Sequence, residues 1–417
     1  MKSVVDDSRL GAVADSINQD RLIGTAVELV SISSPTGHEQ GCADYVAEQL
    51  RGAGMTIAWQ QVEEGRPNVI GTLEGSSGEP SLMFAGHLDT SYSGREPWAG
   101  KSGFKPEPQQ RHGRIFGLGI SNMKGALAAY IEVVRAIRDS GTRLRGDLLI
   151  AGVCGEIEKT QWGEYQGPDF RGYGVGSRAL VVNGVVPDLC ILGEATEGKL
   201  VLGHFGTMWV SLSVSGPFVH SAWSGPHAKE NSILRMLSML PAIEDWISEW
   251  TLSAREAGVA PVVNIGAIRG GYPWRVSRTP AQTELFLDMR VPPSMPMQHA
   301  RASFMRLVAT LRKRFPDHGV KAQTYLAAPG TILDGTHPLV SLIEQAHASV
   351  FGVTPERDIV RWFCDASAFA AHGIPTVIYG PSSGLPGPEG ESLDVSELTN
   401  FTKAYALAAA SLCGVDS

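Results

Sequence analysis

Four polar side chains stand where apolar stretches of the sequence end, and together they could hold a metal ion and move a proton. They are His87 and Asp89 in GHLDT, Glu156 in CGEIEK and Glu194 in LGEAT. His87 could bind a metal ion, with Asp89 as the carboxylate that fixes its tautomer and orientation. Glu194 could add an oxygen ligand, and Glu156 could be the general base for a water molecule activated by the metal.

Each of these residues also has a purely structural interpretation. A histidine at a strand end often has its hydrogen bonds satisfied locally, and a single glutamate there is more often structural than catalytic. Cys154, which precedes GEIE, is expected to be a small core residue. The order of the motifs and their common position at the ends of apolar runs favour a shared site.

The segments that would position these residues alternate between strand-like and helix-like patterns. Residues 20–54 predict two helices joined by a turn, and residues 123–141 have apolar positions at helical spacing. Apolar runs predict strands at 67–75, 80–89, 147–156 and 187–195. This alternation predicts an α/β fold with a mostly parallel sheet and helices on both faces, where ligands bind at the carboxyl ends of the strands. We therefore expect His87, Asn122, Glu156 and Glu194 along one edge of the sheet.

The pattern changes over residues 206–327, which predict a small inserted α+β domain. An alternating, half-exposed strand at 207–216 is followed by a helix at 230–250. Further strands are predicted at 262–271, 281–293 and 320–328. The α/β pattern then resumes. We expect a discontinuous catalytic domain of residues 1–205 and 328–417, interrupted by an inserted domain of residues 206–327.

Composition excludes several functional classes. The 417 residues carry a net charge of −8, and their basic clusters are short, which argues against a nucleic-acid partner. The first residues show no long apolar run, so we expect neither a signal peptide nor a membrane anchor. The five cysteines are dispersed and form no CxxC motif, which is typical of reduced thiols in the cytoplasm.

The motifs follow one another as in the dinuclear-zinc aminoacylase/carboxypeptidase family, which the chain resembles over nearly its whole length. The resemblance is carried by GHLDT, NMKGALAA, GEIE, LGEAT, GPFVHSAWSGPHAKENSI, IRGGYPWRVSRTP and LDMRVPP. It implies hydrolysis of C–N bonds by metal-activated water and a homodimer formed through the inserted domain. It also implies a metal held by His87, Asn122 and Glu194, with Glu156 as the catalytic acid/base. By the same resemblance, His220 reaches the active site of the partner subunit.

The sequence departs from this family at the positions that would hold a second metal. The bridging aspartate is replaced by the neutral Asn122, and the carboxylate expected after Glu156 is replaced by Ile157. The stretch 380–398 lacks the family's final histidine, which would lie roughly at Gly387. We therefore expect one divalent metal ion per subunit, manganese or zinc, although Glu158 or Glu389 could rebuild a second site.

Arginine and tryptophan side chains indicate an anionic, aromatic substrate. In enzymes that resemble this chain, an arginine of the inserted domain binds a substrate carboxylate, and a guanidinium suits that role. The candidate substrate-binding residues are Arg275, Arg278, Arg290 and Trp223. Trp274 and Trp362 add aromatic side chains to segments expected to face the cleft.

This combination resembles a divergent branch of the family, the 5-nitroanthranilate aminohydrolases. It predicts attack on the ring carbon that bears the amine and release of ammonia, with His220 and an arginine stabilising the charge. The alternative is amide hydrolysis of N-acyl or aryl-amide amino acids, as in aminoacylases and carboxypeptidases. A second alternative is a metal- or ligand-binding relic without activity. Glu156 argues against the relic, because binding alone requires no base.

Overall fold

The computed structural model describes residues 8–381 and 387–416. The chain divides into two compact units. The first unit comprises Met1–Gly203, Leu333–Asp358 and Cys364–Ser417, and the second comprises His204–Ile332 and Ile359–Phe363.

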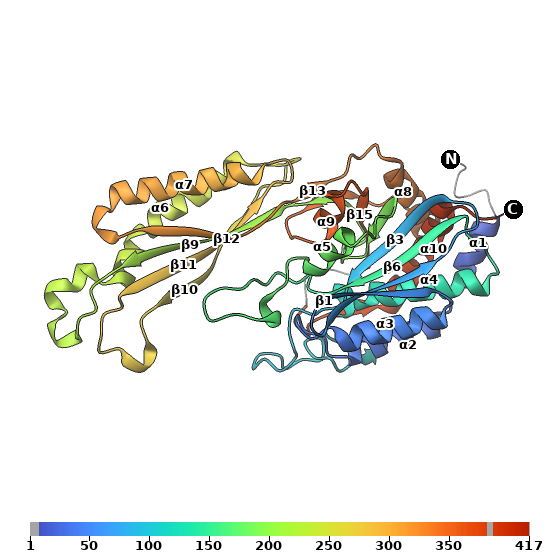
Figure 1. The fold of residues 1–417 in the computed structure, drawn as a ribbon, viewed down its shortest axis with the longest axis horizontal. Helices are drawn as coiled ribbons and strands as arrows, with labels where there is room; N and C mark the ends of the chain where they lie inside the picture. Colours follow the sequence, from blue (N-terminus) through green and yellow to red (C-terminus); the bar gives the residue numbers. More distant parts are fainter. Residues whose placement is uncertain (1–7, 382–386, 417) are drawn as a thin grey trace. The chain divides into compact units, whose positions relative to one another are not determined.

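The first unit is built on a mixed sheet with strand order β1-β2-β6-β3-β7-β15-β8 (Figure 1). Strands β6, β3, β7 and β15 are parallel neighbours, whereas β1, β2 and β8 pair antiparallel at the sides. The strands are β1 (Thr56–Glu63), β2 (Arg66–Leu73), β3 (Glu79–His87), β6 (Gly146–Val153), β7 (Leu189–Leu192), β8 (Leu200–His204) and β15 (Thr376–Ile378). The predicted α/β class with a mostly parallel central sheet is confirmed.

Helices cover both faces of this sheet, and α5 and α9 lie on the opposite side from α3 and α4 (Figure 1). Helix α4 contacts α2, α3 and α10, and its surface is buried on nearly every side because apolar residues surround its axis. The helices are α1 (Ser8–Asp15), α2 (Gln19–Ser31), α3 (Gln40–Gly52), α4 (Gly125–Asp139), α5 (Val175–Val182), α8 (Pro338–Phe351), α9 (Ala366–Ala370) and α10 (Val395–Cys413).

A small antiparallel sheet with the order β16-β5-β4 joins two distant parts of the first unit. Its strands are β4 (Gln109–Arg111), β5 (Arg114–Phe116) and β16 (Ser392–Asp394). Ser392 pairs with Phe116, so the chain just before α10 runs beside the segment that leads to α4. Neither this sheet nor β1 was expected from the sequence. The strands of the sheet are only three residues long, and β1 is largely exposed and has no long apolar run.

The second unit is a four-stranded antiparallel sheet with two helices on one face (Figure 1). Its strand order is β10-β11-β9-β12. The elements are β9 (Gly206–Ser215), β10 (Val263–Gly270), β11 (Gln282–Val291), β12 (Lys321–Ala328), α6 (Ser232–Ser253) and α7 (Met297–Arg314). Inward-facing side chains of β9 and β11 pack against both helices and form a separate core. This agrees with the α+β character expected for the insert.

The described ranges also contain two short strands, β13 (Thr331–Ile332) and β14 (Arg357–Val360), and several short 3₁₀ or π-helical turns. No helix within residues 8–381 and 387–416 is both long and apolar enough to cross a membrane.

Candidate active site and metal centre

Three neighbouring parallel strands deliver three of the predicted site residues to the same edge of the sheet. His87 is the last residue of β3, Glu156 follows β6 and Glu194 follows β7. Because β6, β3 and β7 are parallel, their carboxyl ends meet at one edge. Gly155 has φ 65°, a left-handed conformation that turns the chain so that Glu156 is placed at this edge.

The three side chains converge on a buried point. His87 Nε2 lies 3.7 Å from Glu194 Oε1 and 4.0 Å from Glu156 Oε2. One nitrogen or oxygen atom from each residue lies within 4.8 Å of the others. All three residues are buried, and Glu194 Oε1 has no hydrogen-bond partner in the part of the chain that the structure describes.

Asn122 completes this cluster from the irregular turn before α4. Its Oδ1 lies 2.9 Å from His87 Nε2. The turn is held by the carboxylate of Glu391, which accepts hydrogen bonds from the backbone N–H groups of Ser121 at 3.1 Å and Asn122 at 3.2 Å. Sequence reasoning missed Glu391, because a single acid in a glycine- and proline-rich stretch belongs to no periodic pattern.

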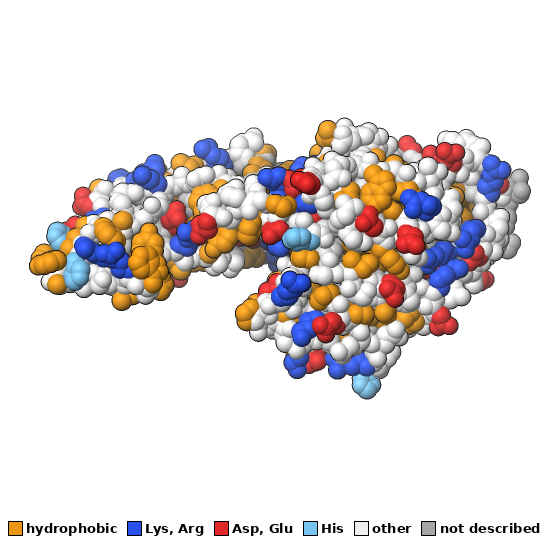
Figure 2. Space-filling model, turned by 60° about the horizontal axis from the view of Figure 1, so that its bottom comes forward, with side chains coloured by type: hydrophobic (Ala, Val, Ile, Leu, Met, Phe, Trp, Pro, Cys, Tyr) orange, Lys and Arg blue, Asp and Glu red, His pale blue; other side chains and the backbone are white. Residues whose placement is uncertain are grey.

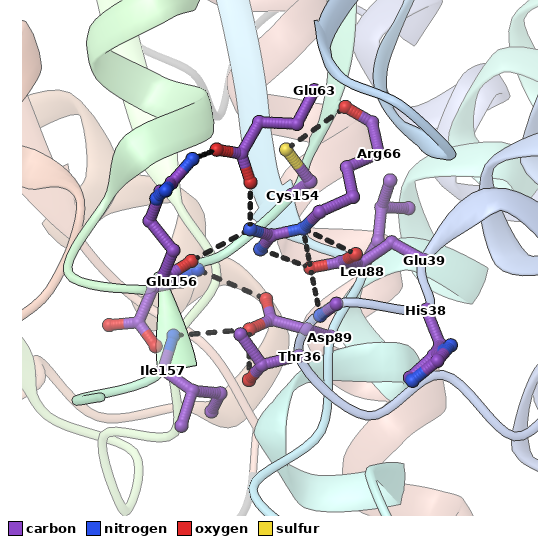
Figure 3. Close-up of polar contacts among 12 residues, drawn as sticks. Thr36, His38, Glu39, Glu63, Arg66, Leu88, Asp89, Cys154, Glu156 and Ile157 are labelled. Atoms are coloured by element: carbon purple, nitrogen blue, oxygen red, sulfur yellow. Dashed lines mark hydrogen bonds and ion pairs between the residues drawn. The ribbon is translucent and has the colours of Figure 1, made fainter. Parts of the chain in front are cut away.

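The carboxylate of Asp89 connects His87 to the segment that carries Glu156. It accepts hydrogen bonds from the backbone N–H groups of Glu156 at 3.1 Å and Ile157 at 3.3 Å, and from the hydroxyl of Thr36 at 2.9 Å (Figure 3). The backbone carbonyl of Asp89 accepts the Nδ1–H of His87 at 2.8 Å, whereas Oδ1 is 3.5 Å away. The main chain of Asp89 therefore fixes the histidine tautomer, and its carboxylate fixes the position of Glu156.

A buried ion pair between Arg66 and Glu39 stabilises the segments next to Thr36 and Glu156. Arg66 donates to both carboxylate oxygens of Glu39, at 2.7 and 2.9 Å, and neither residue is exposed to solvent (Figure 3). Arg66 also donates to the backbone carbonyl of Arg171 at 2.9 Å, and Glu39 accepts the N–H of Gly37 at 3.1 Å. The pair thus ties the turn beside Thr36 to the segment that follows Glu156.

The charges in the cluster depend strongly on one another. Burial raises the pKa of Glu156 well above its usual range, and the nearby charge of Glu194 raises it further. Burial also raises the pKa of Glu194, to about 7, against the opposing effect of His87. Burial alone would lower the pKa of His87, but the charge of Glu194, the interactions with Asp89 and the charge of Glu156 raise it well above the usual value. Glu156 can therefore hold a proton near neutral pH, as a general acid/base requires.

Asp365 is a further buried acid beside this cluster that sequence reasoning missed. It precedes α9, and its Oδ1 accepts a hydrogen bond of 2.6 Å from the hydroxyl of Ser177. Its Oδ2 is buried and has no hydrogen-bond partner among the described residues. Burial raises the pKa of Asp365 to about 6, and its charge in turn raises the pKa values of Glu156 and Glu194.

The other predicted site residues lie on the second unit. The ring of His220 contacts that of Trp223 with centroids 5.4 Å apart, and its Nδ1 accepts the N–H of Ala222 at 3.2 Å. The guanidinium of Arg278 lies 5.5 Å from the ring centre of Phe218, and residue 278 pairs with His220 through the backbone. Three of the residues predicted from the sequence therefore lie close together in the second unit: His220, Trp223 and Arg278.

Two more of the predicted substrate-binding residues differ in their surroundings. Arg275 is exposed and follows Trp274, which is 77% exposed. Arg290 instead pairs with Asp288 at 2.7 Å on β11. Figure 2 shows hydrophobic and histidine side chains gathered at one end of the second unit. The exposed large apolar residues of the segments beside His220 are Phe218, Trp223, Tyr272, Trp274 and Val276.

The sequence profile of Peptidase family M20/M25/M40 matches residues 83–411, which is more than half of the chain. The chain belongs to this family.

Two relatives of this chain are named as a deformylase and a desuccinylase. The N-formyl-4-amino-5-aminomethyl-2-methylpyrimidine deformylase of Bacillus subtilis (strain 168) is 24% identical, and the match covers 93% of each chain. The succinyl-diaminopimelate desuccinylase of Acidiphilium cryptum (strain JF-5) is 25% identical over 91% of this chain and 95% of its own. Among solved structures, the di-peptidase Dug1p from Saccharomyces cerevisiae is similar in fold, with a TM-score of 0.77, 15% identity and 99% of each chain covered. This M20/M25/M40 chain is a metal-dependent hydrolase of C–N bonds.

The side chains of this family member fit a divalent cation at the edge of the sheet. The carbonyl of Asp89 can only accept a hydrogen bond, so Nδ1 of His87 carries a proton and Nε2 is the ring atom directed at Oδ1 of Asn122. In the protonated ring Nε2–H donates to this oxygen at 2.9 Å, and a divalent cation would take the place of that proton. Glu194 Oε1 is buried without a hydrogen-bond partner in the described residues, and a cation at this point would satisfy it. One nitrogen and several oxygen donors without a thiolate suit zinc or manganese.

Two acids were candidates for rebuilding a second metal site, Glu158 and Glu389. Neither belongs to the cluster around His87 in this M20/M25/M40 chain. The side chain of Glu389 is 45% exposed and pairs with Lys101 at 3.0 Å and Arg111 at 3.1 Å. Glu158 is not among the residues whose ligand atoms converge on His87. Within the described residues, the group that could hold a metal consists of His87, Glu156 and Glu194, with Asn122 beside it.

Proposed function

We propose that this chain hydrolyses the C–N bond of a small, carboxylated aromatic amine of the 5-nitroanthranilate type and releases ammonia, using one divalent metal ion per subunit. The observation that carries the proposal is the pairing of His87 with a neutral amide, Asn122 Oδ1, at 2.9 Å. A second cation would need more negative charge than His87, Asn122 and Glu194 supply. Ile157, next to Glu156, offers no ligand atom.

His87, Asn122 and Glu194 would hold the ion, which we expect to be manganese or zinc. When bound there, such an ion lowers the pKa of a water molecule and stabilises negative charge that develops on the substrate. Asp89 keeps the Nε2 atom of His87 available for this role through its main-chain carbonyl.

Glu156 moves the proton. Its carboxylate accepts a proton from the attacking water as the new C–O bond forms at the carbon that bears the nitrogen. The same carboxylic acid then gives this proton to the nitrogen as the C–N bond breaks, and ammonia leaves. The raised pKa of Glu156 suits both steps, because the group must be able to take up and lose a proton near neutral pH.

The second unit would supply the substrate-binding side chains and the dimer contact. Strand β10 lies at the edge of its sheet and is exposed along nearly its whole length, including the apolar Ile265 and Ile268. An exposed apolar edge strand favours pairing with a second copy. In such a homodimer, His220 of the partner subunit, with its neighbouring arginines and tryptophans, would bind the anionic aromatic substrate. Arg275 and Arg278 suit this role better than Arg290, because Arg290 already pairs with Asp288.

The second candidate function is hydrolysis of an amide, either an N-acyl or an aryl-amide amino acid. It is favoured by the relatives named as a deformylase and a desuccinylase. The same residues would act, and Glu156 would protonate the amine that leaves from the acyl carbon. The two candidates differ in the product, since ammonia from an unacylated aryl amine arises only in the first. We place either activity in the cytoplasm, as five free, buried cysteines suggest.

The test is to supply the manganese- and zinc-loaded enzyme with 5-nitroanthranilate, other anthranilates and a panel of N-acyl amino acids. Ammonia release from an anthranilate supports the first candidate, and cleavage of N-acyl substrates alone replaces it with the second. Glu156→Gln should retain the metal and lose at least about 10³-fold in kcat. Glu158→Gln, two residues along the same segment, is the matched control and should keep most of the activity. If Glu156→Gln and the unchanged chain do not differ in metal content or in turnover, the chain is a metal- or ligand-binding protein without catalytic activity.

A further inference from the structure

We propose that Glu391 is a positioning residue that holds the Asn122 amide in place at the metal site. The inference rests on the proposed function, in which Asn122 is a metal ligand. A single carboxylate oxygen of Glu391 accepts the backbone N–H groups of both Ser121 and Asn122, at 3.1 and 3.2 Å. Glu391 therefore holds the main chain at Asn122, the residue whose side chain faces His87. Among the described residues, Glu391 is not part of the group of potential metal ligands.

Glu391 is itself fixed by main-chain contacts on both sides. Its N–H donates to the carbonyl of Gly103 at 3.0 Å, and its carbonyl accepts the N–H of Gly117 at 3.3 Å. The next residue, Ser392, starts strand β16 and pairs with Phe116 of β5. The carboxylate thus projects from a short sheet into the turn before α4, and this turn depends on it for two backbone hydrogen bonds.

Asn122 needs such a restraint more than an aspartate would. A charged ligand is drawn to the metal by its own charge, whereas a neutral amide oxygen gains less and relies on being held in position beforehand. The turn at Asn122 has irregular backbone angles, with φ −131° and ψ 89°, so regular helical hydrogen bonds do not hold this residue. In metal sites, removing a group that orients a ligand typically weakens metal binding by about 10- to 100-fold.

Position also separates Glu391 from the nearby Glu389. The carboxylate of Glu389 faces solvent, where it pairs with Lys101 and Arg111, and Glu391 is turned toward Ser121 and Asn122. The two acids lie two residues apart, yet only Glu391 can act on the ligand. Glu389→Gln is therefore a matched control for the loss of one acidic group from this segment.

The experiment is a double-mutant cycle on metal affinity in the metal-stripped, full-length protein. The dissociation constant for Zn²⁺, and separately for Mn²⁺, is measured by titration calorimetry for the unchanged chain, Glu391→Gln, Asn122→Ala and the double variant. Glu391→Gln should raise the dissociation constant at least about tenfold, and Glu389→Gln should leave it within about twofold. In the Asn122→Ala background, Glu391→Gln should have almost no further effect, because both act through the same ligand. Glu391→Asp, which keeps the charge but shortens the side chain, should also weaken binding.

Three results would overturn the proposal. The first is an unchanged dissociation constant in Glu391→Gln. The second is an equally large effect of Glu391→Gln in the presence and absence of Asn122, which would mean that the charge of Glu391 acts on the site directly. The third is an unchanged affinity in Asn122→Ala, which would remove Asn122 as a ligand and so contradict the proposed function as well. Melting temperatures of the metal-free variants, expected to agree closely with that of the unchanged chain, verify that each one is folded.

Discussion

The carboxylate of Asp89 accepts the backbone N–H of Glu156 at 3.1 Å, so the residue two positions after the metal-facing histidine also determines where the proposed base stands. The contact joins the segments that follow β3 and β6, which are parallel neighbours in the sheet. Placement of His87 and placement of Glu156 are therefore not independent. A change at Asp89 should disturb proton transfer as well as metal binding.

Asp89→Asn should lower kcat by about 10- to 100-fold, because the amide would direct N–H groups toward the backbone donors of Glu156 and Ile157 or lose one of its acceptor contacts. The measurement is steady-state kinetics at saturating metal, which separates the effect on the base from weaker metal binding. Asp188→Asn is the control, because Asp188 also accepts a backbone N–H, that of Ser81, at a partly exposed position away from the cluster. Equal losses in both variants would show that the Asp89 contact has no special importance.

His220 should act on the active site of the partner subunit. Glu156→Gln and His220→Ala are each expected to be nearly inactive alone. When the two variants are mixed in equal amounts and allowed to exchange subunits, about half of the dimers are hybrids, and each hybrid has one intact site. Activity should return to about one quarter of the unchanged enzyme. A mixture that stays inactive after exchange, verified by mass spectrometry of the dimers, would place His220 in the site of its own subunit.

His204 makes the stability of the protein depend on pH. Burial lowers its pKa to about 4. Its Nδ1 donates to the carbonyl of Phe205 at 2.9 Å, and its Nε2 has no partner in the described residues. Above pH 6.5 the ring is neutral in both the folded and the unfolded chain, so it adds no pH dependence. Below that pH the unfolded chain gains a proton that the folded chain does not, so the free energy of unfolding falls until the pH reaches the folded-state pKa.

From pH 7 to pH 5 this effect should lower the free energy of unfolding by about 2 kcal/mol. His204→Asn should lose that part of the pH dependence, which urea unfolding at the two pH values measures. His372→Asn, at an exposed position, serves as the control. If the unchanged chain and His204→Asn lose the same free energy over this range, His204 is not the group responsible.

The sequence predicted the parts of the site that come from strands. His87, Glu156 and Glu194 each follow an apolar run, and the rule that parallel strands expose their carboxyl ends at one edge was enough to bring them together. Asn122 was placed by motif order before α4. The expected proximity of these residues agrees with the geometry because it depends on local patterns and on one topological rule, whereas their catalytic and metal-binding roles stay predictions.

Glu391 and Asp365 could not be found in the same way. Glu391 reaches the site only because β16 pairs with β5, and three-residue strands leave no periodic signal in the sequence. Asp365 stands between a cysteine and an alanine, where nothing distinguishes it from a helix cap; its burial becomes visible only in the folded chain. The role of Asp89 was also only partly anticipated, because its hydrogen bonds run to backbone groups, which the sequence does not mark.

The central claim is that one divalent ion is held by His87, Asn122 and Glu194. The most direct test is the metal content per subunit after the stripped protein is loaded with zinc or manganese and passed through a desalting column. We predict one ion per subunit in the unchanged chain and almost none in the His87→Ala/Glu194→Gln double variant. Two ions that both remain bound per subunit would contradict the account, and so would a single ion that survives the loss of both ligands.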